Sequence, residues 1–297
     1  MRSGELDVAP PPRVEEEAPA PSPVLAPLPT GWRRVRDRID VPVQVGRAAV
    51  FVAFVGLWSF GVEQEWVRPL YSATPKETFD RLVELVSEGA FWRDLLVTLR
   101  EAFSGWLIGS VLGLCVGMVL GRWPRLAKVF GPYLTFANAT PKIAFAPLLI
   151  LWFGIGESSK VALAVIISFF IVQVSTQAAV SLLDPDLTTV ATTMGASELQ
   201  RFRKVILPGI LAAVFGAFRL AAVYALLAAV LGEFLASREG LGQRLITSTN
   251  LFDMPTAFAL IIVLATLALV LNGAVGLVER RLMRWQSQSS RGPSVSL

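Results

Sequence analysis

The sequence is 297 residues long, 54% hydrophobic and only 17% charged, with a mean hydropathy of +0.58. This composition is too apolar for an ordinary soluble domain and is typical of a chain that uses lipid as its solvent. The chain has no histidine and a single cysteine, Cys115, which excludes histidine metal sites, Ser-His-Asp triads and an intrachain disulfide. The net charge of +4 does not indicate nucleic-acid binding, because the basic residues cluster beside apolar segments, as they do in membrane proteins.

The two ends of the chain are polar. Residues 1–30 are rich in proline and contain the acidic run 15–17, a composition that is typical of a disordered tail. Residues 31–46 carry four arginines, and we expect this basic segment to lie at the membrane surface. Residues 286–297 are expected to form a short polar tail.

Six apolar stretches are each long enough to cross a hydrocarbon core about 30 Å thick. They cover residues 47–66, 98–121, 131–153, 160–183, 209–235 and 256–279. We therefore expect an all-α membrane protein with about six transmembrane helices, in one domain over residues 47–285. An amphipathic pattern from Glu77 to Val86 predicts a short surface helix between the first two stretches.

Basic residues follow the second, fourth and sixth apolar stretches. They are Arg122, Arg125, Lys128, Arg201, Arg203, Lys204, Arg280, Arg281 and Arg284. Basic loops beside membrane spans stay on the cytoplasmic side. Both termini are therefore predicted to be cytoplasmic.

The polar segment 184–208, between the fourth and fifth stretches, is patterned as two short helices. Asp184 followed by Pro185 is a typical helix start, with a capping side chain and a proline at the first helical position. Gly195 is expected to end this helix. Its apolar stripe consists of Leu187, Val190, Ala191 and Met194.

The second helix of the segment is predicted by a capping pair, Ser197 and Gln200. Pro208 is expected to mark an elbow where the next span begins. The apolar face of this helix consists of Leu199, Phe202 and Ile206. The sequence leaves two interpretations of these apolar faces. They belong to an interfacial helix that lies on the lipid headgroups, or a soluble partner docks on them.

Gly195, followed after nine residues by Val205-Ile206-Leu207-Pro208, resembles the glycine and I-x-L-P signature in the cytoplasmic "EAA" loop of bacterial ABC importer permeases. This chain has Thr189-Val190-Ala191 where that loop usually has a glutamate and two alanines. The segment 138–156, which begins Asn-Ala-Thr-Pro-Lys and ends Trp-Phe-Gly-Ile-Gly, is similar to the nitrate, sulfonate, taurine and bicarbonate branch of these permeases. The resemblance covers residues 50–285.

The resemblance implies a type I permease subunit in the bacterial inner membrane, which is a transport subunit and not an enzyme. It implies three protein partners: an ABC ATPase subunit, an extracytoplasmic substrate-binding protein and a second copy of the chain. ATP and magnesium are expected in the ATPase subunit, since this chain lacks a G-x-x-x-x-G-K-[ST] loop and needs no cofactor of its own. The implied docking residues are Asp186, Leu187, Thr189, Val190, Ala191, Met194, Gly195, Ala196, Glu198, Leu207 and Pro208.

Five glycines recur at four-residue spacing in the second apolar stretch and predict a smooth ridge for close helix packing. They are Gly105, Gly109, Gly113, Gly117 and Gly121. The packing partner of the ridge, its own chain or a second copy, stays open.

Charged and polar residues within the apolar stretches are candidates for a translocation path, because charge at membrane depth has to face protein or water. Arg219 is equally compatible with a structural ion pair, and Lys142 lies between two prolines that break a helix. Glu233 is expected to line the outer mouth. The full set of path candidates is Asn138, Thr140, Lys142, Gln173, Gln177, Arg219 and Glu233.

Two basic groups at membrane depth favour a small organic or inorganic anion as the solute, in the sulfonate, taurine, nitrate or bicarbonate class. Neutral pyrimidine-like compounds remain an alternative. A secondary transporter driven by an ion gradient is the competing function, although its spans would need coupling groups that this sequence offers sparingly. An intramembrane enzyme would need a nucleophile with a base or paired carboxylates, and neither is evident in the sequence.

Overall fold

The computed structural model describes residues 32–283, with side chains from residue 43 onward. The predicted tails 1–30 and 286–297 lie outside these residues. The described chain divides after Phe54 into two units, and every site discussed below belongs to the second.

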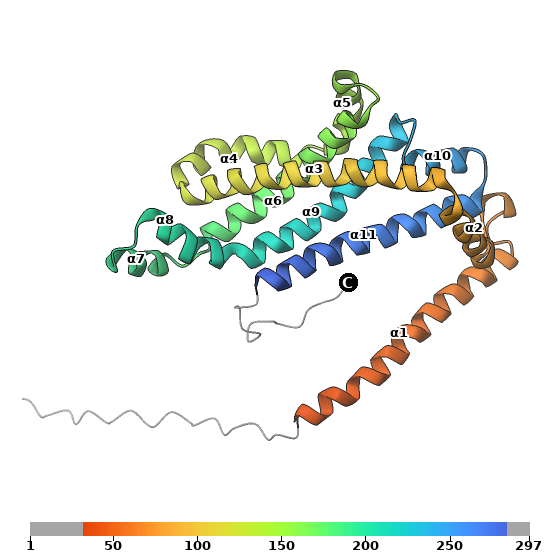
Figure 1. Ribbon diagram of the computed structural model, residues 1–297, viewed down its shortest axis with the longest axis horizontal. Coiled ribbons are helices and arrows are strands. Elements are labelled where there is room, and N and C mark those ends of the chain that lie inside the picture. The colour runs from red at the N-terminus through yellow and green to blue at the C-terminus, as the bar shows by residue number, and fades with distance from the viewer. Residues whose placement is uncertain (1–31, 284–297) are drawn as a thin grey trace, which may run out of the picture. The chain divides into compact units, whose positions relative to one another are not determined.

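The described residues form helices joined by short loops and include no β-strand (Figure 1). The helices are α1 (Trp32–Glu63), α2 (Pro75–Ser87), α3 (Gly89–Arg122), α4 (Pro124–Ala139), α5 (Ala146–Phe153), α6 (Glu157–Ser181), α7 (Pro185–Thr193), α8 (Glu198–Arg201), α9 (Leu207–Leu235), α10 (Leu241–Asn250) and α11 (Met254–Leu282). Short 3₁₀ turns cover Pro69–Tyr71 and Lys142–Phe145, and a π-helical turn covers Phe202–Ile206. The predicted surface helix between the first two spans is confirmed as α2.

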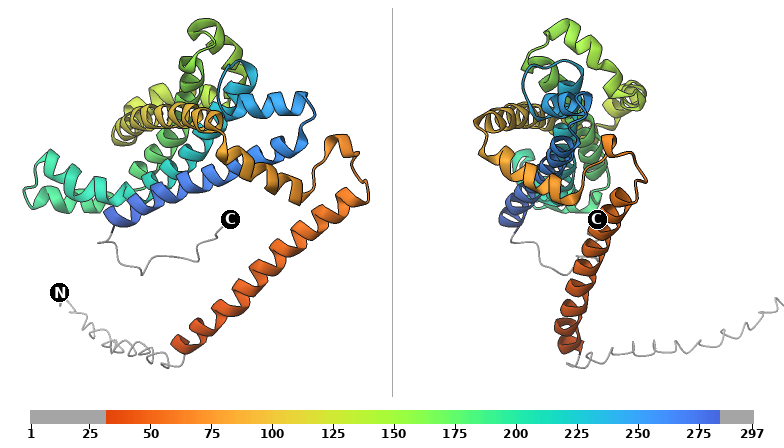
Figure 2. Two further views of the ribbon diagram at one scale, coloured as in Figure 1. Left: turned by 45° about the vertical axis from the view of Figure 1, so that its right-hand side comes forward. Right: turned by 90° about the vertical axis from the view of Figure 1, so that its right-hand side faces the viewer.

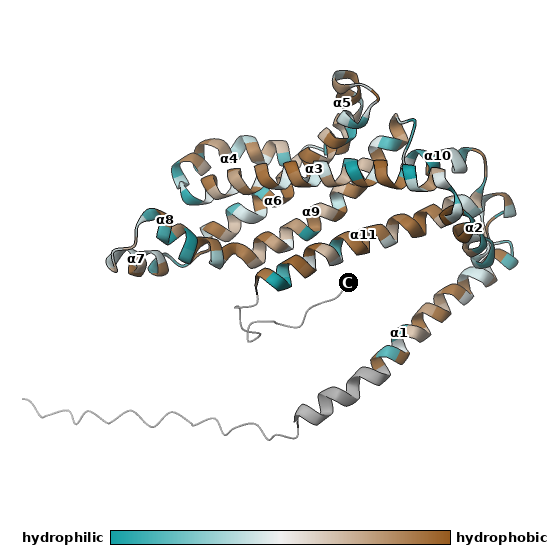
Figure 3. Ribbon diagram, viewed as in Figure 1, coloured by the Kyte–Doolittle hydropathy of each residue, from teal (hydrophilic) through white to brown (hydrophobic). Residues whose placement is uncertain are grey.

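Five described helical segments are long and apolar enough to cross a membrane. They are Val43–Glu63, Gly89–Arg122, Glu157–Ser181, Glu198–Leu235 and Met254–Leu282. Figure 3 shows hydrophobic residues along most of α9 and α11. The prediction of an all-α chain with about six spans is confirmed, because the described residues include five such helices and make six spans if a bent pair of helices counts as one.

The predicted third span, 131–153, is not one helix. It consists of α4 and the segment Lys142–Phe153, which meet at an angle of 82°. Thr140 precedes Pro141, and a residue before proline disfavours the helical conformation. Thr140 accordingly has an extended backbone, with φ −67° and ψ 134°. Hydropathy alone could not show this break, and α5 projects away from the long helices in Figures 1 and 2.

The glycine ridge of α3 packs against α6 of the same chain. A Cβ atom added at Gly109 would lie 2.5 Å from the carbonyl oxygen of Val165, and one at Gly113 would lie 2.5 Å from that of Phe169. Gly117 has the same relation to Gln173, at 2.7 Å. Because backbone atoms cannot move aside cheaply, only glycine permits this approach of the two helices.

Gly113→Ala should therefore destabilise the protein by about 1–3 kcal/mol through overpacking. Gly273→Ala in α11 is the matched control, because a Cβ there meets nothing within 4 Å. Thermal unfolding of the two purified variants measures the difference. Equal melting temperatures would show that the α3–α6 contact does not need a glycine at this position.

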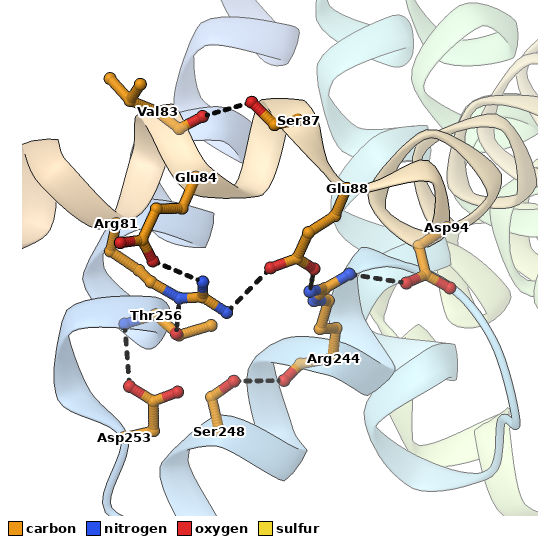
Figure 4. Close-up of polar contacts among 10 residues, drawn as sticks. All are labelled: Arg81, Val83, Glu84, Ser87, Glu88, Asp94, Arg244, Ser248, Asp253 and Thr256. Atoms are coloured by element: carbon orange, nitrogen blue, oxygen red, sulfur yellow. Dashed lines mark hydrogen bonds and ion pairs between the residues drawn. The ribbon is translucent and has the colours of Figure 1, made fainter.

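Two arginines tie together the helix ends that lie near α2 (Figure 4). Arg81 of α2 bonds Glu88 at 3.1 Å and donates from Nε to Thr256 of α11 at 2.8 Å. Arg244 of α10 pairs with Glu88 and, at 3.5 Å, with Asp94 of α3. This network therefore joins α2, α3, α10 and α11 outside the apolar part of the domain.

Glu88 makes this network sensitive to pH. Partial burial opposes the charged form of Glu88, but the hydrogen bonds and charges of Arg244 and Arg81 outweigh burial and hold the pKa of Glu88 below its ordinary value of 4.5. A carboxylate with a lowered pKa in the folded state contributes stability that is complete above the unfolded-state pKa and is lost as the pH falls through the folded-state pKa.

We expect the melting temperature of the purified protein to fall on acidification below about pH 4.5. Glu88→Gln should lower the melting temperature at neutral pH and flatten its dependence on pH. Glu84→Gln is the control, because Glu84 is an exposed partner of Arg81 alone. Identical pH profiles for wild type and Glu88→Gln would contradict the prediction.

Candidate functional site

The segment between α6 and α9 has the predicted form of helix, glycine break, helix. The Asp184 side chain caps α7 by accepting a hydrogen bond from the Asp186 amide at 2.9 Å. Gly195 has a φ of +79°, a left-handed conformation that strains any residue with a side chain. Ser197 and Gln200 form the predicted capping box at the start of α8.

The apolar residues of α7 and α8 are left uncovered by the described chain. Leu187 and Val190 are about half exposed, and Met194 is 81% exposed. Leu199 of α8 is 64% exposed. We call these four residues the α7–α8 patch. Of the second predicted stripe, Phe202 is half-buried and Ile206 is buried, so these two residues anchor the segment to the domain.

The predicted elbow at Pro208 is absent. Helix α8 continues through the π turn Phe202–Ile206 into α9, and the run Glu198–Leu235 qualifies as one span of 38 residues. A proline removes one backbone donor, and a widened π turn is a usual way for a helix to absorb such a local mismatch. The α7–α8 patch is therefore attached to a long unbroken helix.

The remaining predicted docking residues lie in the same segment or in the helix that follows it. Glu198 pairs with Arg122 of α3 at 3.1 Å and with Arg201, which fastens α8 to the end of α3. The Thr189 hydroxyl donates to the Pro185 carbonyl at 3.0 Å. The others are exposed Asp186, half-buried Ala191 and Ala196, and Leu207 and Pro208 in the first turn of α9.

A cavity of about 480 Å³ lies where α4 ends, against α6 and α9. Two of the predicted path residues, Asn138 and Lys142, line it. The other lining residues are Ile143, Ile167, Phe170, Ile171, Val174, Ser175, Leu220 and Tyr224. We call this space the Lys142 cavity.

Lys142 carries a positive charge into this apolar wall. Its ammonium donates to the carbonyl oxygen and the side-chain oxygen of Asn138, at 2.7 and 3.0 Å, and lies 4.9 Å from the centre of the Phe170 ring. No carboxylate pairs with Lys142 within residues 43–283. A cation at membrane depth that has only neutral partners attracts an anion.

Three other path candidates do not line the Lys142 cavity. The Thr140 hydroxyl donates to the Phe136 carbonyl at 3.0 Å, a bond back to the last turn of α4. Gln173 is 1% exposed beneath the glycine ridge and donates to the Gln177 side chain at 2.7 Å. Burial of Gln173 follows from the close α3–α6 contact, which a single sequence does not reveal.

Arg219 forms an ion pair with Glu279 of α11 at 2.9 Å. The sequence left two interpretations of Arg219 open, a residue of the path and a structural ion pair, and the structure shows the ion pair. The partner lies 60 residues away along the chain, so helical spacing around Arg219 could not identify it. Arg219 is accordingly not a free positive charge on the path.

Glu233 does not line an open mouth, because its side chain is fully buried. It accepts hydrogen bonds from the Thr98 hydroxyl at 2.7 Å and from the Gly242 amide at 2.5 Å. A Cβ atom at Gly240 would lie 2.4 Å from the Glu233 carboxyl. Glu233 therefore fixes the start of α10 to the end of α9, which is a structural role.

Two buried charged residues were missed by sequence reasoning. Glu101 of α3 is 1% exposed and Lys160 of α6 is 2% exposed. Both lie near the ends of apolar stretches, where a charge costs little if it reaches water. Only the packing of α3, α6 and α9 places them inside the protein.

Residues 109–284 match the family model described as "Binding-protein-dependent transport system inner membrane component". This match covers more than half of the chain. The chain belongs to this family. It is therefore a multi-pass permease subunit of the inner membrane, a transport component rather than an enzyme. The family also decides against a transporter that is driven by an ion gradient alone.

Individual relatives agree with this assignment. The permease is 32% identical to the riboflavin transport system permease protein RibX of Chloroflexus aurantiacus, over 86% of this chain and 95% of the relative. It is 30% identical to the putative aliphatic sulfonates transport permease protein SsuC of Bacillus subtilis, over 81% of this chain and 86% of the relative. It is 26% identical to the taurine transport system permease protein TauC of Escherichia coli, over 86% of this chain and 94% of the relative.

Solved structures show the same fold. A chain of the inward-facing MetNI methionine ABC transporter aligns with a TM-score of 0.58 at 19% identity, over 65% of the permease and 95% of that chain. A chain of a bacterial ABC transporter involved in the import of alginate also aligns with a TM-score of 0.58, at 15% identity, over 84% of the permease and 98% of that chain. Membership of the family implies that the permease works with an ATPase and a substrate-binding protein.

Proposed function

We propose that two copies of the permease enclose a path for a small organic anion, and that the α7–α8 patch of each copy docks on an ATPase subunit. ATP and magnesium are bound by the ATPase, and closure of two ATPase subunits moves the patch between two positions. In this arrangement α7, α8 and both termini are cytoplasmic. The substrate-binding protein delivers the anion at the other end.

The observation that carries this proposal is the exposure of the α7–α8 patch. Four apolar side chains stand on a loop that is capped at both helix starts and turned by a glycine with positive φ. Such a rigid, exposed apolar surface is typical of a protein interface. The basic residues Arg203 and Lys204 follow it directly, which supports a cytoplasmic position.

Val190→Glu and Met194→Glu should release the ATPase, because each places a charge where an apolar contact is proposed. Co-purification of the ATPase from membranes in mild detergent should fall at least tenfold. Thr193→Glu, on the same helix at an exposed polar position, is the matched control and should retain the ATPase. Normal recovery with both patch variants, together with normal uptake, would refute docking at this surface.

The solute class is inferred from the Lys142 cavity. Its volume of about 480 Å³ suits an organic molecule and far exceeds what an inorganic ion such as nitrate fills. Lys142 supplies the charge, and the rings of Phe170 and Tyr224 offer flat apolar surfaces. The named solutes of relatives include riboflavin, formylaminopyrimidine, taurine and aliphatic sulfonates. An organic anion is compatible with this range.

A homodimer is proposed because one copy supplies only one wall of the path. The Lys142 cavity is bounded by α4, α6 and α9 of a single chain. Beside it, α4 and α5 expose the large side chains Tyr133, Phe136, Leu151 and Trp152. A second copy placed against this face would close the path from the opposite side.

Lys142→Gln should lower uptake of the anion by about tenfold or more, since a charged hydrogen bond to the solute is lost. Lys142→Arg should retain part of the activity. Lys128→Gln in the neighbouring helix α4 removes an exposed charge away from the cavity and serves as control. Uptake into proteoliposomes that contain the ATPase and the binding protein gives the measurement. Unchanged uptake by Lys142→Gln would remove this cavity from the path.

A further inference from the structure

An apolar groove lies between α3, α9 and α11, apart from the α7–α8 patch and the Lys142 cavity. It has a volume of about 420 Å³. Four aromatic side chains form one wall: Phe103 and Trp106 of α3, and Phe215 and Phe218 of α9. The centroids of neighbouring rings along this wall are 5.6 to 6.2 Å apart, so the four rings form a continuous surface. We call this space the aromatic groove.

The aromatic groove offers an occupant only apolar side chains. The one ring nitrogen on its wall, Trp106 Nε1, already donates to the Phe218 carbonyl at 3.0 Å. The α11 side of the groove consists of Leu271, Ala274, Val275 and Val278. Phe103 and Val278 are about half exposed, so the groove is open at the surface of the domain. An occupant of matching chemistry is therefore an apolar chain.

One end of the groove meets the charged end of α11. Residues 254–278 include no charged residue, and Glu279, Arg280 and Arg281 follow directly. Figure 3 shows this change from hydrophobic to hydrophilic residues along α11. At 1.5 Å per residue the uncharged run spans about 37 Å, enough to cross a hydrocarbon core about 30 Å thick. The charged residues 279–281 therefore lie at the boundary between hydrocarbon and lipid headgroups, and the groove lies directly inside this boundary.

Arg219 of α9 lies at the same boundary. Its Nη2 atom pairs with Glu279 at 2.9 Å, and a Cβ atom added at Gly276 would lie 3.6 Å from Nη1, so the guanidinium lies against α11. Arg219 directly follows Phe218, which lines the groove. Its side chain is still 41% exposed. Because a guanidinium has five N–H donors, the pair with Glu279 leaves donors for a second anion.

Arg281 adds a positive charge on the groove side of α11. It lies three residues after Val278 and seven after Ala274, which both line the groove, and residues at these spacings share one face of a helix. Arg281 is exposed and forms no ion pair within residues 43–283. The groove end therefore has two arginines and one carboxylate, and its net charge is positive.

We propose that the aromatic groove binds an acyl chain of an anionic phospholipid, and that Arg219 and Arg281 bind the phosphate group of this lipid. The acyl chain packs against the aromatic wall, and the phosphate oxygens accept hydrogen bonds from the guanidinium groups. Basic residues between membrane helices are typical of such lipid sites. The lipid belongs to the cytoplasmic leaflet, an assignment that rests on the orientation given under the proposed function.

The charge at the groove end favours a lipid over a helix of a second copy. The most exposed span of the described chain is α1, which has no buried residue over Val43–Glu63. With six spans, α1 begins on the side of the membrane where α11 ends. That end of α1 carries Arg47 and follows the basic segment 31–46. Arginines of α1 beside Arg219 and Arg281 would repel them, whereas an anionic headgroup attracts them.

Native mass spectrometry can measure lipid binding to the full-length permease, purified with its ATPase in a mild non-ionic detergent. Phosphatidylglycerol should bind with a Kd at least tenfold lower than that of phosphatidylcholine with identical acyl chains, because only phosphatidylglycerol has a net charge. Glycerol 3-phosphate, which has no acyl chain, should not compete. Equal Kd values for the two lipids, or competition by glycerol 3-phosphate, would overturn the proposal.

Two adjacent arginines provide a matched pair of variants. Arg281→Gln should raise the Kd for phosphatidylglycerol about fivefold, the effect of one basic residue beside an anionic headgroup. Arg280→Gln removes an equally exposed charge from the opposite face of α11 and should change this Kd little. Equal effects of the two variants would mean a diffuse attraction to the end of the helix, and the assigned site would be wrong.

Ala274→Phe fills the groove from α11 without a change of charge. It should weaken the binding of both lipids at least tenfold, whereas Ala265→Phe, at an exposed position of α11 outside the groove, should not. Unchanged binding by Ala274→Phe would exclude the groove. If wild type binds no phosphatidylglycerol and Ala274→Phe separates two permease copies, the occupant is a second copy and the proposal fails. The Lys142 cavity and the α7–α8 patch are untouched by these variants, so either failure leaves the proposed function intact.

Discussion

The close contact between α3 and α6 is the constraint on which the rest of the domain depends. Lipid provides no hydrophobic force between helices, so two helices associate in a membrane through van der Waals contact and hydrogen bonds at short range. The five glycines of α3 bring its backbone onto α6 at distances that no other residue permits. This contact fixes which faces of α6 remain for other partners.

Two cavities border those remaining faces of α6. One face of α6 carries Phe170 and Val174 into the Lys142 cavity. The start of the same helix carries Lys160 into a cavity of about 340 Å³ that Glu101 also lines, where Gly232 of α9 leaves room for the lysine stem. A loss of the α3–α6 contact would therefore disturb both cavities together, although they lie at different depths.

Much of the architecture could be predicted from the sequence, and particular residues explain where prediction stopped. Apolar length predicts the spans, and Asp184, Gly195 and Ser197 predict the form of the α7–α8 segment because capping and left-handed glycine are local effects. The break at Thr140 is also local, but hydropathy averages over it. The partner of Arg219 and the burial of Gln173 depend on residues that lie far away along the chain. A local sequence pattern does not reveal such residues.

The charged residues show the same limit of prediction from local sequence. Mid-span charges such as Arg219 and Lys142 attract attention because lipid penalises them, whereas Glu101 and Lys160 lie near span ends where sequence gives no alarm. Tertiary packing buries the second pair more completely than the first. Depth along a span is therefore a poor guide to the environment of a charge, and helix packing decides it.

The unbroken run from Glu198 to Leu235 connects the two ends of the domain. At 1.5 Å per residue, its 38 residues span about 57 Å, enough to cross the hydrocarbon core with length to spare. One end is fastened to α3 by the Glu198–Arg122 pair, and the other holds α10 through Glu233. In the proposed docking, a displacement of the α7–α8 patch would pass into α9 along a continuous helix, because the π turn leaves no break at Pro208. The same helix lines the Lys142 cavity with Leu220 and Tyr224, so the proposed docking surface and this cavity share one helix.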